Sequence, residues 1–330
     1  MSRWSKILAF ALGTALLASA VPATAAPLQE LTMGLGSGSL VGGSARVAKE
    51  LGLFEKHGFD AKLTVMDSGS AAAAAMAGGS FKVVVCGPGD LISLKARGQD
   101  ALAVLPTYNG LGVNLILDKK VAARLGVSAS APVRERLKAL DGVLIGTTSP
   151  TTVATISLKQ AAEAAGAKIR FAYMTQPAFF AALQTGAIEG HIGGAPFWAP
   201  SIIQGVGVSW INGSKGEFPP EYAPGISSLL ATRADVAKAE PDFVRRVAAV
   251  FVDLGRAVQE RPADVKAAIA KLYPSFDANT IDLLFDSEAA AWVTAPITAA
   301  QIAHEIVMLK ATGAAPPDVD KVDPASMVFH

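Results

Sequence analysis

Short apolar runs alternate with stretches of helical periodicity along most of the chain. Val143–Ile145 is a continuous apolar run after a turn at Leu140–Gly142, which is typical of a buried strand in a parallel sheet. A hydroxyl-rich turn follows, and apolar residues then recur at helical spacing until Gly166. Because the order of strand, turn and helix recurs several times, the pattern predicts an α/β fold with parallel, doubly wound sheets.

The apolar runs fall into two groups of predicted strands. In the first group we expect strands at Leu31–Leu35, Ala61–Met66, Phe81–Cys86 and Ala101–Leu105. In the second group we expect strands at Val143–Ile145, Lys168–Ala172, Ile188–Ile192 and Val206–Ile211. The segment Leu111–Leu117 is expected to cross from the first group to the second, and Ile226–Ala231 is expected to return the chain.

A weak internal repeat supports this division. Ala75–Pro88 parallels Ala182–Pro196, and each copy runs from a helix end through a glycine turn and a strand to a Gly/Pro loop. Two similar α/β lobes would produce such a repeat. A chance recurrence of common βα turn chemistry would produce it as well.

The chain after Ala231 is predicted to be helical. Phe243, Val247 and Phe251 belong to one apolar helix face. Thr298 with Gln301 forms a capping box that begins the last predicted helix. This tail contains no recognisable chemical motif, and we interpret it as packing.

The first residues have the pattern of a secretory signal peptide. Arg3 and Lys6 form a basic start, and Ile7–Ala20 is an apolar core too short to span a membrane. Ala23–Ala25 supplies an A-x-A cleavage site, so we expect residues 1–25 to be removed. An N-terminal membrane anchor is the alternative. The absence of cysteine near the predicted cleavage site argues against a lipoprotein anchor.

The amino-acid composition argues against nucleic acid, disulfide bonds and a local metal site. The 330 residues carry a formal net charge of +1, which argues against nucleic acid because phosphate binding requires a basic surface. Cys86 is the single cysteine, so no intramolecular disulfide can form. The four histidines are far apart in the sequence and show no local metal-ligand spacing.

The glycines near the N-terminus do not form a dinucleotide-binding motif. Ser39 and Val41 occupy the third-glycine positions of the patterns that start at Gly34 and Gly36. We therefore predict no cofactor. Close backbone approach to a small ligand is the preferred explanation of these glycines.

The turns between strands and helices are candidate ligand sites. Each exposes backbone N–H groups at the positive end of a helix dipole, beside serine or threonine hydroxyls, and can bind a small anion or carboxylate. A well-capped turn without a ligand is the competing interpretation of any single one of them.

Four segments together resemble a known family: Ala45–Gly58, Ser68–Ser70, Gly142–Pro150 and Gly186–Trp198. They resemble the periplasmic substrate-binding proteins of ABC importers, in the branch that holds aliphatic-sulfonate, taurine, nitrate/bicarbonate and thiamine-precursor binders. The resemblance covers most of the chain up to the middle of the helical tail. Lys82 is a departure, since the family often has an acidic residue there, and Glu189 keeps the acid in the second half.

The resemblance implies a type II periplasmic binding fold of two doubly wound α/β lobes. Lobe I would combine residues 26–110 and 224–330, with the helical tail packed on it, and lobe II would be residues 111–223. The two crossovers near Tyr108–Gly112 and Pro224–Ser228 would form a hinge. The implied function is capture of a small organic anion, sulfonate- or carboxylate-like, by hinge closure in the periplasm. The implied partners are the ligand, an ABC permease and its ATPase, and the implied state is a monomer.

Loop positions in this fold suggest the ligand-binding residues. In lobe I these are Ser37, Ser39, Ser68, Ser70, Asp90 and, at the hinge, Tyr108. In lobe II they are Thr147, Ser149, Thr151, Gln176, Phe197 and Trp198. The hydroxyls would hold an anionic head and the aromatic rings an apolar body. Each has a structural alternative: the aromatics can be core, and Asp90 can be a helix cap.

Two other functions stay open at the level of sequence. A secreted α/β enzyme needs a nucleophile with a base, a metal cluster or a cofactor motif, and no G-x-S-x-G, HExxH or CxxC is present. We therefore predict no catalytic residues and no enzyme, although convergent geometry would escape such motifs. A soluble sensor lobe for a membrane receptor would use the same ligand-induced closure.

Overall fold

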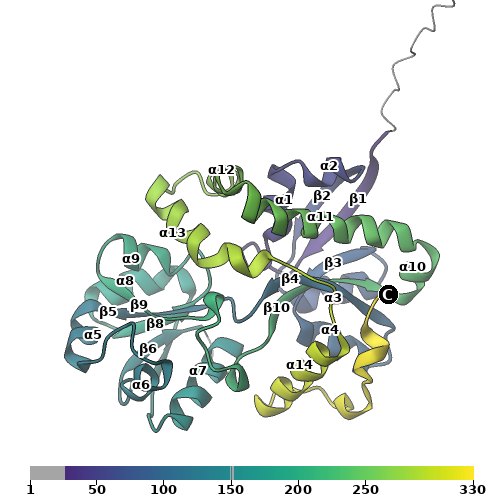
Figure 1. Ribbon diagram of the computed structural model, residues 1–330. Helices are drawn as coiled ribbons and strands as arrows, with labels where there is room; N and C mark the ends of the chain where they lie inside the picture. The colour runs from purple at the N-terminus through teal and green to yellow at the C-terminus, as the bar shows by residue number, and fades with distance from the viewer. Residues whose placement is uncertain (1–26, 149, 151) are drawn as a thin grey trace, which may run out of the picture.

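The computed structural model describes residues 27–148, 150 and 152–330, so the predicted signal peptide lies outside the described residues. The described chain forms two α/β lobes, each built around a five-stranded sheet (Figure 1). The chain passes between the sheets twice, before the fifth strand and before the tenth. The two lobes confirm the predicted fold class, while the exact residue boundaries of the domains stay a prediction.

The first sheet has the strand order β2-β1-β3-β10-β4. Its members are β1 (Gln29–Leu35), β2 (Phe59–Val65), β3 (Val83–Cys86), β4 (Ala101–Asn109) and β10 (Ile226–Arg233). The first three strands are parallel, as predicted, but β10 runs antiparallel to both of its neighbours. The sheet is therefore mixed, because the chain returns from the second lobe at the edge where the parallel strands end.

The second sheet has the strand order β7-β6-β8-β5-β9. Its members are β5 (Asn114–Asp118), β6 (Leu144–Thr147), β7 (Arg170–Tyr173), β8 (Gly190–Gly193) and β9 (Gly207–Asn212). Here β5 is the antiparallel strand, for the same reason, since it enters from the hinge. The expectation of wholly parallel sheets is thus corrected in both lobes.

Helices cover both sheets, which explains why the central strand β3 is buried at every position. The helices of the first lobe are α1 (Ser44–Glu50), α2 (Leu53–Lys56), α3 (Gly69–Ala77) and α4 (Pro88–Ala96). Those of the second lobe are α5 (Lys119–Leu125), α6 (Val133–Lys138), α7 (Val153–Ala164), α8 (Phe179–Thr185) and α9 (Ala199–Ile203). No helix among the described residues is long and apolar enough to cross a membrane.

The C-terminal part of the chain is helical, as predicted. It contains α10 (Ala234–Ala239), α11 (Pro241–Glu260), α12 (Pro262–Leu272), α13 (Ala278–Glu288) and α14 (Ala299–Ala311). The predicted apolar face of α11 is buried in the core of the first lobe. The capping box of Thr298 and Gln301 begins α14, which confirms that prediction.

Helix α13 reaches beyond the first lobe. It contacts α9 and the short 3₁₀ helix η2 (Gly213–Lys215), both of which belong to the second lobe. In Figure 1 it lies between the two lobes, above the crossover segments. The C-terminal tail therefore also contacts both lobes and links them.

Candidate functional site

A cleft of about 670 Å³ lies between the two sheets. Its lining follows the carboxyl ends of β3, β6, β7 and β8, and the starts of β5 and β10. Residues of both lobes and of α14 contribute to it. Ligands of α/β sheets bind at this edge, where loops from several strands converge. The volume falls within the range of pockets that enclose small organic molecules.

The first-lobe wall includes Ser39, Ser70 and Asp90, all predicted from the sequence. Ser70 donates its hydroxyl to Asp90 Oδ1 at 2.6 Å, and Asp90 Oδ2 accepts the backbone N–H of Gly87 at 3.0 Å. A Cβ atom on Gly69 would lie 2.1 Å from Asp90 Oδ2, so this close approach requires glycine. Asp90 therefore closes the first turn of α4 as well as facing the cleft.

The second-lobe wall includes Gln176, as predicted, together with Thr148 and Thr152. Gln176 Oε1 accepts the backbone N–H of Gly194 at 3.1 Å, which fixes the loop after β8. Thr152 is the N-cap of α7 and accepts the backbone N–H of Thr155. Sequence reasoning placed ligand contacts in this turn at Ser149 and Thr151, but both lie outside the described residues.

The other predicted contact residues lie away from the cleft lining: Ser37, Ser68, Tyr108, Thr147, Phe197 and Trp198. Ser68 is the N-cap of α3, and Ser37 shares a hydrogen bond with Ser39 at 2.8 Å between the two hydroxyl oxygens. These two hydroxyls serve the local turns in this conformation.

The buried members of this set are held inside the fold. The hydroxyl oxygens of Thr147 and Thr155 are 2.7 Å apart, and Thr147 is buried. Trp198 is 2% exposed and belongs to the main hydrophobic core, as the structural alternative in the sequence suggested. Tyr108 is fully buried and donates its hydroxyl to Glu288, and its hydroxyl oxygen lies 2.9 Å from that of Ser214, so that its polar group points into the hinge region.

The C-terminal helix α14 forms part of the cleft, which the sequence analysis missed. Glu305, Met308, Leu309 and Thr312 line it. The interpretation of the tail as packing alone is therefore corrected. The sequence held a signal for this, because Glu305 lies three residues after Ile302 on the buried face of an amphipathic helix, where a carboxylate is costly unless it has a function or a partner.

Glu305 is only 4% exposed. Its Oε1 accepts the backbone N–H groups of Gly225 and Ile226, at 2.7 and 3.1 Å. Burial raises the pKa of its carboxyl from 4.5 to about 7, while these N–H bonds and the charge of His304 oppose the rise. The group is thus close to its midpoint at neutral pH.

The polar groups that line the cleft include two carboxyls, Asp90 and Glu305, and within the described lining no lysine, arginine or histidine. The cations singled out in the sequence are engaged elsewhere. Arg46 donates to the carbonyl of Gly38 at 2.9 Å, and Lys82 forms an exposed ion pair with Glu240 at 2.6 Å. The part of the chain that the structure describes has no group of His, Cys, Asp and Glu side chains suited to a metal ion.

His191 lies in β8 and is completely buried. Its ring stacks on Phe179 with centroids 4.9 Å apart, and its Nε2 is 2.9 Å from the hydroxyl oxygen of Ser201. Burial lowers its pKa from 6.5 to about 4, so the ring is neutral. It does not line the cleft, which agrees with the interpretation of a core histidine.

We expect His191 to make the protein sensitive to acid. Its folded-state pKa lies below the unfolded value, so its contribution to stability is complete above pH 6.5 and is lost as the pH falls toward about 4. At pH 5 the loss relative to pH 7.5 is about 2 kcal/mol.

Urea unfolding of His191→Gln and the parent at both pH values measures this loss as the difference between their pH responses. His330→Gln, at the chain end, is the matched control and is expected to follow the parent. Equal responses of His191→Gln and the parent would contradict the assignment.

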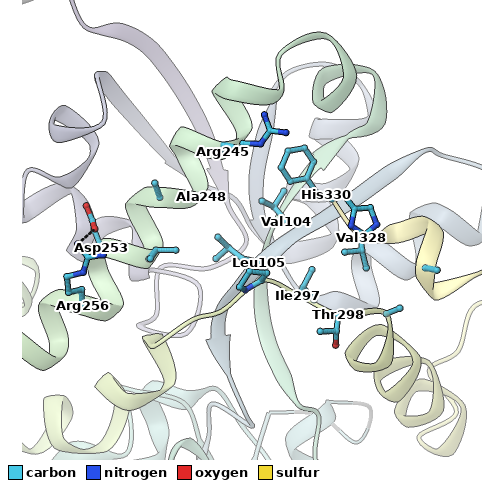
Figure 2. Close-up of a pocket in the computed structure, with 16 residues that line it drawn as sticks. Val104, Leu105, Arg245, Ala248, Asp253, Arg256, Ile297, Thr298, Val328 and His330 are labelled. Carbon is cyan, nitrogen blue, oxygen red and sulfur yellow. Dashed lines mark ion pairs between the residues drawn. The ribbon is translucent and has the colours of Figure 1, made fainter.

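A larger cavity, of about 750 Å³, lies on the first lobe alone. Figure 2 shows Arg245, Ala248, Asp253 and Arg256 of α11 on one side, Ile297, Thr298 and Val328 of the C-terminal segment on the other, and Val104 and Leu105 of β4 between them. Because no described residue of the second lobe lines it, closure of the lobes would not alter it. The interlobe cleft is therefore the candidate site.

Comparison with known proteins agrees with this architecture. A model of the NMT1-like family matches residues 25–273. No curated protein matches the sequence.

Solved structures of similar fold cover almost the whole chain. The aliphatic sulphonate binding protein SsuA of Escherichia coli is 19% identical, with a TM-score of 0.68, over 92% of this chain and 98% of that one. The alkanesulfonate-binding protein SsuA of Xanthomonas axonopodis pv. citri, bound to MOPS, is 18% identical, with a TM-score of 0.62, over 89% and 96%. The nitrate-binding protein NrtA of Synechocystis PCC 6803 is 14% identical, with a TM-score of 0.59, over 89% and 86%. These likenesses confirm the type II periplasmic binding fold.

Proposed function

Because the chain belongs to the NMT1-like family, we propose that it is the periplasmic solute-binding component of an ABC importer. It captures a small organic molecule between its lobes and presents the closed form to a membrane permease and its ATPase. The named sulfonate- and nitrate-binding proteins of the same fold support a ligand with an anionic group. The protein acts as a monomer and as a binder, not an enzyme.

The observation that carries this proposal is the cleft itself, which residues of both lobes line at the carboxyl ends of the strands. A ligand there contacts both lobes only when they are together, so binding favours the closed form. From the first lobe Ser39, Ser70 and Asp90 would contact it, and from the second Gln176 would do so.

Two crossover segments supply the hinge in this proposal. Gly110 donates its backbone N–H to Gly225 O at 2.7 Å, and Ser227 donates its hydroxyl to Gly110 O at 2.6 Å. Gly112 in turn donates its N–H to the Ser227 hydroxyl at 2.9 Å. The two segments are thus tied side by side, and rotation at their glycines would move one lobe against the other.

A hydrogen bond between α7 and α14 also joins the two lobes. Gln160 of α7 donates from Nε2 to the carbonyl of Ala311 at the end of α14, at 2.8 Å. Both helices carry residues of the cleft lining. We propose that ligand release breaks this contact as the lobes separate.

We expect a cognate ligand to raise the thermal midpoint of the chain that starts at Ala26. The panel comprises alkanesulfonates, taurine, nitrate, aromatic carboxylates and pyrimidines. A ligand at about 1,000 times its Kd adds about 4 kcal/mol of stability, which is readily measured. Chromatography of the ligand after incubation should show it unchanged.

A matched pair of variants on α7 locates the binding. Ala154 lines the cleft, whereas Ala164 on the same helix is exposed. Ala154→Trp fills the cleft and should abolish the shift, and Ala164→Trp should preserve it. Retention of the shift in Ala154→Trp would refute the cleft as the site, and conversion of a compound would favour a secreted enzyme instead.

A further inference from the structure

Among the described residues, the lining of the cleft has one carboxylate oxygen without a hydrogen-bond partner. Glu305 is buried by more than nine tenths, lines the cleft, and uses only Oε1 for the backbone N–H groups of Gly225 and Ile226. Its Oε2 has no hydrogen-bond partner among the described residues. This oxygen is accessible from the cleft, so water or a ligand in the cleft can satisfy it.

In Asp90, the other carboxyl of the lining, both oxygens have hydrogen-bond partners. Asp90 uses Oδ1 for the Ser70 hydroxyl and Oδ2 for the Gly87 N–H, both within the first lobe. Its negative charge still faces the cleft from α4. Glu305 is therefore the carboxyl of the lining with an oxygen that no described residue engages, and Asp90 adds to the negative potential around it.

The helix starts around the cleft are already capped by side-chain oxygens. Ser68 accepts the Ala71 N–H at the start of α3, and Asp90 accepts the Gly87 N–H at the start of α4. Thr152 caps α7. The positive ends of these helices are thus partly neutralised from within, and the described lining offers no cationic side chain to a bound anion.

Resting on the proposed function, we propose that the transported ligand carries an N–H-donating cationic group, a protonated amine or amidine, which Glu305 receives. Charge-assisted hydrogen bonds of this kind are short and strong when they are shielded from water. An anionic group elsewhere in the ligand makes it a zwitterion. An anion without an N–H donor brings a further negative charge to a lining that holds two carboxyls. The apolar side chains of Met308, Leu309 and Val41 enclose the body of the ligand.

The test compares probes that differ only in the amino group. One pair is taurine and ethanesulfonate, and the other is 4-(aminomethyl)benzoate and 4-methylbenzoate. Calorimetric titration at pH 7.5 should show at least tenfold tighter binding of the aminated member in one pair. In Glu305→Gln this preference should fall by about tenfold or more, since the charge is lost while the acceptor of the Gly225 N–H remains. Glu240→Gln, at a lobe I carboxylate that pairs with Lys82 and does not line the cleft, should retain it.

The pH dependence supplies a second readout. The titratable groups around Glu305 are its neighbour His304 and, across the cleft, Asp90 on α4. If the carboxylate receives the cation, affinity for the aminated probe should rise about tenfold from pH 6 to pH 8, as Glu305 with a pKa of about 7 ionises. An opposite slope would mean that protonated Glu305 donates to the ligand, and it would overturn the inference.

The outcomes separate the inference from the proposed function. If neither aminated probe binds, or if Glu305→Gln binds them as tightly as the parent, the inference is wrong. Binding of the amine-free acids in that case leaves the solute-binding function standing. If no probe binds and none stabilises the protein, the result counts against both.

Discussion

Replacing Glu288 with alanine is expected to lower the free energy of unfolding by about 3–5 kcal/mol. Glu288 is completely buried at the end of α13 and accepts hydrogen bonds from four side chains. They are Tyr108, which lies in β4 of the first lobe, Ser214 and Asn114, which belong to the second, and the adjacent Ser287. Alanine would leave these donors with fewer acceptors and would open a cavity among them.

The position of this cluster explains the size of the effect. It joins α13, the first lobe and the second lobe at the point where the chain crosses between them. Burial raises the pKa of Glu288 and that of Tyr108, so the pair has little tendency to carry two negative charges. Because the cluster links α13 with both lobes, its loss should also weaken ligand binding.

Urea unfolding of the purified chain measures the change. Glu288→Gln has nearly the same size and keeps an acceptor oxygen, so it should cost about 1 kcal/mol. Glu240→Ala, at an exposed ion pair, should cost less than about 1 kcal/mol. If the alanine and glutamine variants of Glu288 prove equally stable, the hydrogen-bond cluster does not stabilise the protein as described.

The second large effect is a pH dependence of stability that Glu305 imposes. Its folded-state pKa is raised from 4.5 to about 7, so the folded protein holds a proton that the unfolded chain has released. Stability is therefore unaffected below pH 4.5, falls as the pH rises from about 4.5 to about 7, and is lower by about 3 kcal/mol above that.

Glu305→Gln removes this titration and keeps the acceptor for the Gly225 and Ile226 N–H groups. The variant should gain stability over the parent by about 3 kcal/mol between pH 4.5 and pH 8, measured by urea unfolding at each pH. The same comparison in a His304→Gln background removes the neighbouring imidazole and should keep the slope. A difference that stays constant with pH, or one that decreases, would contradict the assignment.

His191 also makes stability depend on pH, but in the opposite direction, because folding lowers its pKa. Its contribution is lost as the pH falls from 6.5 toward 4, whereas that of Glu305 is lost as the pH rises from 4.5 toward 7. Over the shared interval the two contributions offset each other in the parent protein. Because the residues lie in different lobes, their separate variants should expose slopes of opposite sign.

Local sequence determined the elements and the fold class. Apolar runs such as Val83–Cys86 could only be buried strands, and the capping box of Thr298 and Gln301 marked the start of α14. Such signals depend only on residues that are close in the chain, so they can be recognised from the sequence. The turns at the ends of the strands were found for the same reason, and with them Ser39, Ser70, Asp90 and Gln176 of the cleft.

Tertiary structure alone decided which side chains face the cleft. Tyr108 has the chemistry of a ligand contact, but Ser214 and Glu288, both distant in the sequence, hold it inside the fold. Glu305 lies in a helix that resembled packing, and only the folding of the tail against Gly225 brings it to the cleft. The direction of β10 was likewise set by the return of the chain from the second lobe. The spacing of apolar residues indicates which face of a helix or strand is buried. The hydrogen-bond partner of a polar group often depends on contacts between residues far apart in the chain.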